Sequence, residues 1–544
     1  MCGGCGAPAG PREIKQSLVE IMMLIQKPIR AVFVRVEGLL DYVFPHAWNP
    51  LYNLGALGFF MYWIVAVSGI YVYIFFDTGI TEAYGSIEYM TNDQWYLAGI
   101  MRSLHRYASD AMVLFMLIHI VREFSLDRYR GARWFTWFTG VPIFIFVFLS
   151  GITGYWLVWD RLAQYVALKS TEWLDWVPIF GTSIAANFVA PDSLDDRFFT
   201  LMIFIHIVAP LILLLILWIH LQRVRKPIIN PPRGLAIGMF VSLLVLSLVW
   251  PATSQAPADL STVVSVVNLD WFYLGLYPLL DYWSAGSLWA AAVVVFGTFA
   301  IMPLMPPLKR SPAAEVILEH CNGCTRCVDD CPYSAIIMRP RSDGRAFIGE
   351  AVVDPGLCVS CGICVGSCPS ASPFRKRSDL VSGIELPDYM LSELRAKTCK
   401  ASDSLSGGTR ILVFGCDPGA RIGGKVASLA AMVRMPCIGM LPPAFIDWAL
   451  SRGLADGIVI TGCREGNCQH RRGVDWTNAR LDRKRDPQLR RRVPRTRILR
   501  FWASPVDGKA LDKAITRFAE SVSQLPEQEK GRTRKPDLVG ASDE

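Results

Sequence analysis

The stretch RSLHRYASDAMVLFMLIHIVR, residues 102–122, places His105 and His119 fourteen positions apart. The stretch IHIVAPLILLLILWIH, residues 205–220, repeats that spacing with His206 and His220. Fourteen residues make nearly four helical turns, so both histidines of a pair face the same way, about 21 Å apart along the helix. Two such helices packed together form two stacked bis-imidazole sites. Each site suits one haem, whose iron accepts axial histidine nitrogens.

The composition divides the chain into two chemically different parts. The 544 residues are 52% hydrophobic, which excludes a purely soluble protein and predicts several domains. Apolar residues are concentrated before about residue 310, and most of the 15 cysteines follow residue 320. The first 20 residues contain no apolar leader. The cysteine spacings are those of metal ligands and imply a reducing compartment. We interpret the net charge of +8 as membrane-side and partner-facing charge, not as a nucleic-acid patch.

Six apolar segments could cross a bilayer, which takes about 20 residues each. They are residues 52–76, 99–121, 134–158, 199–222, 234–251 and 286–305, of which the fifth is the weakest. Residues 15–45 are amphipathic and are expected at the membrane surface. The loops after the second and fourth spans are basic and the loop after the first is acidic, so the positive-inside rule places everything after the sixth span in the cytoplasm. The pair His105 and His206 then lies toward the outer face of a prokaryotic cytoplasmic membrane, and the pair His119 and His220 toward the inner face.

Glycines repeat the same spacing in two helices that carry no histidine. Gly55 and Gly69 lie fourteen residues apart in the first span, and Gly140 and Gly154 lie fourteen apart in the third. A flat macrocycle between helices needs missing side chains on the helices that do not supply histidine. The alternative is ordinary helix-packing glycine, which is common in membranes. The matching spacing favours clearance for the haems.

Residues 46–305 resemble cytochrome b of the quinol-oxidising cytochrome bc complexes. The resemblance includes GALGFFMYWIVAVSG, GYWLVW and DDRFFTLMIFIHIVAPLILLLILWIH besides residues 102–122. It implies an all-α transmembrane bundle with two b haems. Arg102 and Arg122 hold the positions at which that family places arginines against haem propionates. The segment NLDWFYLGLYPLLDYWSAG looks like the outer quinone-site segment of the family.

Both quinone-site motifs depart from the family pattern. The family has Pro-Glu-Trp-Tyr where residues 269–272 read Leu-Asp-Trp-Phe, so Asp270 is the candidate quinone proton acceptor. The alternative for Asp270 is a solvated loop carboxylate at the membrane surface. The usual Pro-Trp-Gly reads Val-Trp-Asp and ends at Asp160. At the inner site Arg225 replaces the expected histidine and Leu235 the expected aspartate, which makes Arg225 the candidate residue there. We expect quinone binding, slightly favouring the inner site.

Two cysteine runs follow the Pro-rich stretch MPLMPPLKRSP. They are Cys321-x2-Cys324-x2-Cys327-x3-Cys331-Pro332 and Cys358-x2-Cys361-x2-Cys364-x3-Cys368-Pro369. This is the spacing of a bacterial ferredoxin with two [4Fe-4S] clusters, in which the fourth cysteine of each run binds the other cluster. One cluster is therefore expected on Cys321, Cys324, Cys327 and Cys368, and the second on Cys358, Cys361, Cys364 and Cys331. A zinc site would need only one such quartet.

Residues 408–522 are typical of an α/β domain. The expected strands are RILVFG, RMPCIGML, DGIVITG and RILRFWA. Four cysteines lie at or beside the strand ends, namely Cys416, Cys437, Cys463 and Cys468. Buried free thiols are the alternative for them. The segment GCREGNCQH resembles the delta subunit of methyl-viologen-reducing hydrogenase, which implies that the four cysteines bind one [2Fe-2S] cluster and that the domain docks on a heterodisulfide-reductase-like flavoprotein.

Three further sequence patterns give weaker evidence about function. Gly419-x4-Gly424-Lys425 resembles a P-loop, but Val426 replaces the required Ser or Thr. Cys2 and Cys5 form a CxxC that could share a metal with a partner, and Cys399 is expected to be structural. Ten Arg or Lys residues within 480–500 are interpreted as a solvated helix face or docking surface.

These patterns predict a multi-domain electron-transfer protein. The expected parts are a surface segment (1–45), the transmembrane cytochrome b domain (46–305), a linker (306–313), the ferredoxin domain (314–375), a second linker (376–407), the [2Fe-2S] domain (408–522) and a disordered tail (523–544). The first hypothesis is the membrane subunit of a quinone-linked oxidoreductase, with the primary substrate on a flavoprotein or other cytoplasmic dehydrogenase partner. The second is a non-quinone electron conduit and anchor for a soluble redox complex. A bc-type cytochrome that feeds a Rieske protein ranks last. Dimerisation through the cytochrome b domain is one option, and no nucleic-acid partner is expected.

Overall fold

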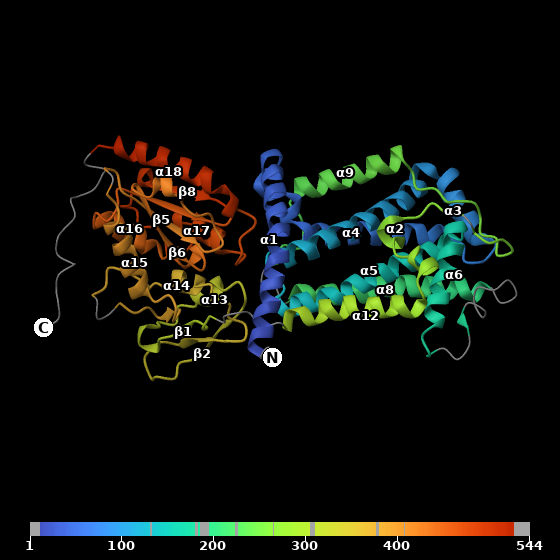
Figure 1. The fold of residues 1–544 in the computed structure, drawn as a ribbon, viewed down its shortest axis with the longest axis horizontal. Coiled ribbons are helices and arrows are strands. Elements are labelled where there is room, and N and C mark those ends of the chain that lie inside the picture. Colours follow the sequence, from blue (N-terminus) through green and yellow to red (C-terminus); the bar gives the residue numbers. More distant parts are fainter. Residues whose placement is uncertain are drawn as a thin grey trace, which may run out of the picture. The chain divides into compact units, whose positions relative to one another are not determined.

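The computed structural model describes residues 11–130, 133–179, 183–184, 195–222, 227–264, 266–304, 311–376, 380–406 and 408–526. The chain separates into two compact units. The first, here called the helical unit, comprises residues 1–33 and 39–307, and the second, the mixed unit, comprises residues 34–38 and 308–544. The first is built from helices, whereas helices and strands alternate in the second (Figure 1).

The N-terminal amphipathic segment forms the long helix α1 (Pro11–Val43). The expectation that residues 15–45 lie at the membrane surface stays a prediction. Its large apolar side chains Leu24, Val32, Leu39 and Val43 are exposed, between 56% and 66% of their surface. Two short 3-10 turns, η1 (His46–Trp48) and η2 (Pro50–Tyr52), follow it.

Five helices of the helical unit are long and apolar enough to cross a membrane. They are α2 (Leu54–Phe75), α4 (Ile100–Ser125) with the π-helical turn η3 (Trp95–Gly99) before it, α5 (Trp134–Val158), α8 (Asp196–Gln222) and α12 (Ala285–Ile301) with η5 (Met302–Leu304) after it. Helix α2 packs along α4, and α5 packs along α8 (Figure 1). Each histidine-bearing helix thus lies against one glycine-bearing helix.

The remaining expected span is a shorter helix. Helix α9 (Arg233–Val249) has 17 residues, about 25 Å of helix, against the roughly 20 residues that a span needs. Its side chains Ile237, Val241, Val245 and Val249 are nevertheless exposed by 47% or more. Whether α9 crosses decides on which side of the membrane the chain continues.

Short helices and irregular chain connect the long helices. These are α3 (Glu82–Asn92), α6 (Arg161–Asp175), α10 (Trp271–Leu274) and α11 (Leu279–Tyr282). The segment between α9 and α10 is tied to the start of α6, since Gln164 bonds the backbone of Asp259 in both directions at 2.8 Å. The Trp159 carbonyl also accepts from the Ala258 amide at 3.1 Å.

The first part of the mixed unit contains the two cysteine runs. Strand β1 (Glu315–Val316) pairs antiparallel with β4 (Ile384–Glu385), and β2 (Ile336–Pro340) pairs antiparallel with β3 (Gly349–Val353). Each run enters a short helix, α13 (Arg326–Asp330) or α14 (Ile363–Ser367). We call this part the ferredoxin domain.

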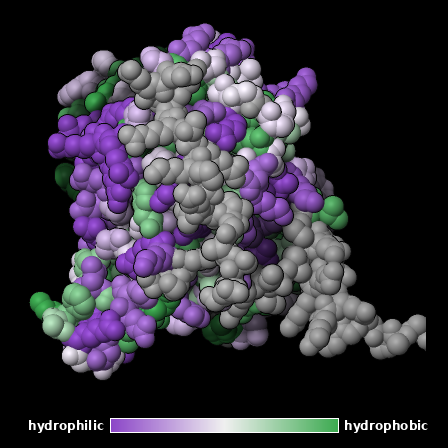
Figure 2. Space-filling view, turned by 90° about the vertical axis from the view of Figure 1, so that its left-hand side faces the viewer, coloured by the Kyte–Doolittle hydropathy of each residue, from purple (hydrophilic) through white to green (hydrophobic). Residues whose placement is uncertain are grey.

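The second part is a parallel sheet covered by helices, here called the α/β domain. Strands β5 (Ile411–Cys416), β6 (Ala430–Met435), β7 (Gly457–Gly462) and β8 (Ile498–Trp502) lie in the order β6-β5-β7-β8. Its helices are α15 (Leu391–Asp403), α16 (Pro443–Ser451), α17 (Gly473–Leu481) and α18 (Gly508–Ser523). Surface side chains drawn in Figure 2 on this part of the molecule are mostly hydrophilic.

Two expectations for this domain were wrong. The second strand ends at Met435, and residues 438–440 form the 3-10 turn η9 (Ile438–Met440), because Pro436 has no amide hydrogen to continue the ladder. Residues 376–407 are not only a linker, since they contain α15, which packs on β5 and β6. The two domains share one hydrophobic core that contains Cys331 and Cys364 as well as Cys416 and Cys463.

Candidate haem and iron–sulfur sites

One histidine pair already has the spacing of a bis-imidazole site. His105 of α4 and His206 of α8 have ring centroids 6.2 Å apart, with an angle of 68° between the ring planes. Metal–imidazole bonds are about 2 Å long, so an iron held between two facing imidazoles would separate their centroids by roughly 6 Å. The spacing of the two rings therefore fits a pair of imidazoles that would hold one haem iron between α4 and α8.

The side-chain hydrogen bonds fix which ring nitrogen faces the metal. The Nδ1 atoms of His105 and His206 lie 2.9 Å from the carbonyl oxygens of Val65 and Ser150. A carbonyl oxygen only accepts, so each Nδ1 carries the hydrogen and each Nε2 keeps its lone pair for iron. Metal-binding histidines commonly have such a partner on their second nitrogen.

A hydroxyl and a glycine accompany three of the four histidines. Ser68, Thr153 and Thr139 each precede one of the spaced glycines. Their hydroxyl oxygens lie 3.3 Å, 3.3 Å and 2.9 Å from Nδ1 of His105, His206 and His220, respectively. The sequence interpretation missed these three residues, although the hydroxyl–glycine dipeptide at fourteen-residue spacing would have identified Thr139 and Thr153.

The four spaced glycines all face the imidazoles, and two of them lie too close to a ring for any side chain. A β-carbon on Gly69 would lie 2.7 Å from Cε1 of His105, and one on Gly154 would lie 2.8 Å from Cε1 of His206. At the other pair the space is wider, 3.6 Å between Gly55 and His119 and 3.9 Å between Gly140 and His220. Each glycine therefore faces a predicted ligand ring, and at Gly69 and Gly154 the missing side chain accommodates that ring.

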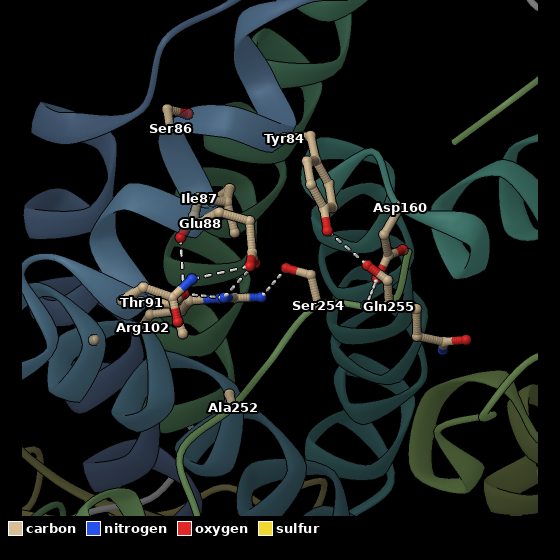
Figure 3. A network of polar contacts seen from close by, with 12 residues as sticks. Tyr84, Ser86, Ile87, Glu88, Thr91, Arg102, Asp160, Ala252, Ser254 and Gln255 are labelled. Carbon is tan, nitrogen blue, oxygen red and sulfur yellow. Dashed lines mark hydrogen bonds and ion pairs between the residues drawn. The ribbon is translucent and has the colours of Figure 1, made fainter. Parts of the chain in front are cut away.

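The two predicted propionate arginines are both buried and both have protein partners. Arg102 contacts Thr91, donates to the Ser254 hydroxyl at 2.8 Å and lies 3.8 Å from Glu88 (Figure 3). Arg122 lies 3.4 Å from the carboxylate of Glu123. A role against haem propionates stays a prediction for both.

The altered Pro-Trp-Gly motif has a structural consequence. Asp160 caps α6 by accepting from the Ala163 amide at 2.9 Å and also accepts from the Gln255 amide at 2.8 Å (Figure 3). The aspartate that replaces glycine therefore anchors the segment that leads to the predicted outer quinone site.

Asp270 is not a solvated loop carboxylate. Its side chain is 2% exposed, and Arg106 lies 2.9 Å from one carboxylate oxygen, which the Tyr155 hydroxyl also contacts. The other oxygen caps α10 by accepting from the Phe272 amide at 2.9 Å. A second carboxylate, Asp110, lies 3.3 Å from the same arginine. The predicted proton acceptor is thus part of a buried network of acid, guanidinium and phenol groups.

The sequence singles out several other residues, some of which lie outside the part of the chain that the structure describes. Arg225, the candidate for the inner quinone site, lies outside the described residues, as do Cys2 and Cys5 and the tail after residue 526. Leu235 is buried on α9. Cys399 is half-buried on α15. The basic stretch 480–500 is not one solvated helix face, because α17 ends at Leu481 and Arg480 and Arg497 are buried.

The eight ferredoxin-type cysteines gather around two hollows, four at each. One hollow is lined by Cys321, Cys324, Cys327 and Cys368, and the other by Cys331, Cys358, Cys361 and Cys364. Each hollow takes three cysteines from one run and the fourth cysteine from the other. The fold therefore brings together the crossed sets that the spacing predicts.

The thiols are held where an uncompensated thiolate is unfavourable. Burial, followed by the neighbouring sulfurs of Cys368, Cys324 and Cys321, raises the pKa of Cys327 to about 12. Burial also raises the pKa of Cys364 well above its ordinary value. Bound iron reverses this preference, because a metal deprotonates the thiol that coordinates it. The donor set fits cluster binding.

The four cysteines of the α/β domain lie at the carboxyl end of its sheet. Cys416 ends β5, Cys463 follows β7, and their sulfurs are 3.7 Å apart. A β-carbon on Gly473 would lie 3.4 Å from the sulfur of Cys468 and would collide with that of Cys437.

Comparison with known proteins gives three matches along the chain. Residues 39–228 match Cytochrome b/b6/petB, residues 320–372 match the 4Fe-4S dicluster domain, and residues 411–526 match Methyl-viologen-reducing hydrogenase, delta subunit. The cytochromes b6 of Porphyra purpurea and Pyropia yezoensis are each 31% identical over 195 residues, which are 35% of this chain and 88% of theirs. A solved structure named Hyperthermophilic respiratory Complex III aligns with a TM-score of 0.40 and 16% identity, over 47% of this chain and 75% of that chain.

The fold and its sites define a membrane protein for electron transfer, with haem and iron–sulfur domains in one chain. Through its helical unit the chain belongs to the cytochrome b/b6 family. It adds a 4Fe-4S dicluster domain and a domain like the hydrogenase delta subunit.

Proposed function

We propose that this protein is the membrane electron-transfer subunit of a quinone-linked oxidoreductase. It would bind two b haems, two [4Fe-4S] clusters and one [2Fe-2S] cluster. Through them it would pass electrons between a cytoplasmic flavoprotein or dehydrogenase and the quinone pool. The observation that carries the proposal is the crossed arrangement of the eight cysteines in a chain that also pairs His105 with His206. The primary substrate would be converted on another subunit.

The proposed ligands divide by cofactor. His105 and His206 would hold one haem, and His119 and His220 the other. When bound, the haems and clusters supply one-electron carriers. The chain's own part is to orient the imidazoles through Val65 and Ser150 and to exclude water from the buried thiols.

The quinone reaction is proposed at the Asp270 network. A quinol must release protons as it loses electrons, and Asp270 is a carboxylate held beside Arg106 and the Tyr155 hydroxyl. Quinone binding near Arg225 remains the alternative location. Quinol oxidation at Asp270 would send electrons inward, which an outside-positive potential opposes by about 2.3 kcal/mol per charge per 100 mV. The same potential favours the opposite flow, from the cytoplasm to the outer face.

The test is haem reduction by a quinol analogue in the purified complex, with and without Asp270→Asn. Asparagine still accepts the Phe272 amide hydrogen bond that caps α10, but its amide cannot take a proton. We expect haem reduction in the unmodified protein and at least about a tenfold slower rate in the variant. Asp281→Asn is the matched control, because Asp281 is a half-exposed carboxylate that pairs with Lys169 on the same side of the unit.

The outcomes separate the two hypotheses. If no quinol changes the haem spectrum, the quinone-linked function is wrong and the non-quinone conduit and anchor takes its place. If Asp270→Asn reacts like the unmodified protein, the quinone site lies elsewhere. A co-purifying Rieske subunit would favour a bc-type cytochrome.

A further inference from the structure

Ligand loops of the two iron–sulfur domains meet in one buried contact. Cys361 and Ile363 of the ferredoxin domain and Cys437 of the α/β domain form one apolar cluster. Helix α14 and turn η9 lie so close that a β-carbon on Gly366 would collide with the carbonyl oxygen of Gly439. The missing side chain at Gly366 therefore lets the two backbones touch beside the cysteines.

A single guanidinium joins the two loops. Arg480 of α17 is 1% exposed. It donates to the carbonyl oxygen of Gly439 at 2.8 Å and to the carboxylate of Asp330 at 2.5 Å. Gly439 is two residues after Cys437, and Asp330 immediately precedes Cys331. One planar side chain thus fixes a ligand loop of the α/β domain to a ligand loop of the ferredoxin domain.

The junction carries more positive than negative charge. Asp330 is itself 2% exposed, and its carboxylate also accepts hydrogen bonds from Arg485. Two guanidinium groups therefore face one carboxylate. The Nε atom of Arg480 is buried, and no hydrogen-bond acceptor lies within reach of it in the part of the chain that the structure describes. Burying an N–H group without a partner costs free energy, so this donor points to an acceptor that binds there. A cluster with sulfur atoms and thiolate ligands is such an acceptor.

We propose that Arg480 is a positioning residue for electron transfer between the two iron–sulfur domains. It holds the [2Fe-2S] site of the α/β domain against the [4Fe-4S] site of Cys331, Cys358, Cys361 and Cys364, and its charge stabilises the reduced [2Fe-2S] cluster. In this step one electron leaves the reduced cluster of one domain and enters the oxidised cluster of the other. No bond forms or breaks, and no proton is transferred. This inference rests on the proposed cofactor set.

The test is a redox titration of the purified full-length protein, followed by electron paramagnetic resonance of each cluster. Removal of a nearby cation disfavours the reduced cluster. We expect Arg480→Gln to lower the reduction equilibrium constant of the [2Fe-2S] cluster at least tenfold, which equals about 59 mV for one electron. Arg480→Lys retains the charge and should stay within about threefold of the unmodified protein.

The matched control is Arg497→Gln. Arg497 is also a buried arginine, but it donates to the carbonyl oxygens of Asp456 and Ala455 within the α/β domain. It should leave the potential unchanged. An unchanged [2Fe-2S] potential in Arg480→Gln, with full iron content, would overturn the proposal.

A second measurement on the unmodified protein decides the matter if Arg480→Gln loses its clusters. In the fully reduced protein, the [2Fe-2S] signal should relax faster because of the neighbouring paramagnetic [4Fe-4S] cluster, and Cys361→Ser should abolish that effect. Equal relaxation in both proteins would overturn the proposed contact. Absence of any [2Fe-2S] signal or iron would instead contradict the proposed function.

Discussion

At the scale of single residues, the predicted haem ligands are oriented by groups on the facing helix. The carbonyl oxygens of Val65 and Ser150 lie four residues before Gly69 and Gly154, and each accepts from a histidine Nδ1. In an α-helix such a carbonyl already bonds the amide four residues later. The missing glycine side chain exposes it to a second donor. Glycine therefore supplies both space and an acceptor for the imidazole.

This arrangement predicts the effect of adding one methyl group at Gly69. The β-carbon of Gly69→Ala would lie 2.7 Å from Cε1 of His105, so the ring must move away from its place opposite His206. We expect the pyridine haemochrome assay to fall from about two haems per chain to about one.

Two further glycines serve as controls for that substitution. A β-carbon on Gly58, in the same helix, would meet nothing within 4 Å, so Gly58→Ala should retain both haems. Gly140→Ala, whose β-carbon would lie 3.9 Å from His220, should retain them too. If Gly69→Ala keeps full haem content and an unaltered spectrum, its role in accommodating His105 is refuted.

At the scale of elements, the short helices α13 and α14 decide how the cysteines are shared. Each helix carries the third cysteine of one run, and each run then turns so that its last cysteine reaches the hollow of the other. The two sites differ in exposure. Cys324 is exposed, whereas Cys331, Cys361 and Cys364 are buried. Among the described residues, the site with Cys324 is thus the more exposed of the two.

The crossed arrangement makes a prediction that a sequential arrangement does not. Cys368→Ser should weaken or remove the cluster of Cys321, Cys324 and Cys327, although Cys368 belongs to the other run. We expect a loss of about four iron atoms per chain and of one of two [4Fe-4S] signals. Cys399→Ser, outside both hollows, is the control. Loss of the signal from the buried site instead would show that each run binds its own cluster.

At the scale of the whole molecule, the sidedness of the iron–sulfur domains depends on α9. Five long spans and a sixth crossing by α9 would return the chain to the face on which it began, whereas a surface-bound α9 would leave it on the opposite face. The exposed side chains Ile237, Val241 and Val249 favour a helix in contact with lipid.

If α9 crosses, residues 311–526 lie on the same face as the basic loops after α4 and α8. The positive-inside rule makes this the cytoplasmic face, so we expect these residues there. Protease added to inverted membrane vesicles should release fragments of these residues, and protease added to right-side-out vesicles should not. A site engineered in the loop between α2 and α3, near Thr78, should show the opposite pattern. Cleavage of residues 311–526 from the outside would mean that α9 does not cross.

The sequence by itself determined the identity of the proposed ligands and the classes of cofactor. Those signals are local, because a spacing of fourteen residues on one helix makes both histidines face the same way, and two residues between successive cysteines set the loop around a cluster. It also indicated the α/β domain, and three of the four expected strands are found at the expected positions. Only tertiary structure decided the rest. The burial of Asp270 among Arg106 and Tyr155, and the junction made by Arg480, depend on contacts between residues more than 100 positions apart. No local pattern encodes such contacts, because packing sets both the burial and the partners of a charged group.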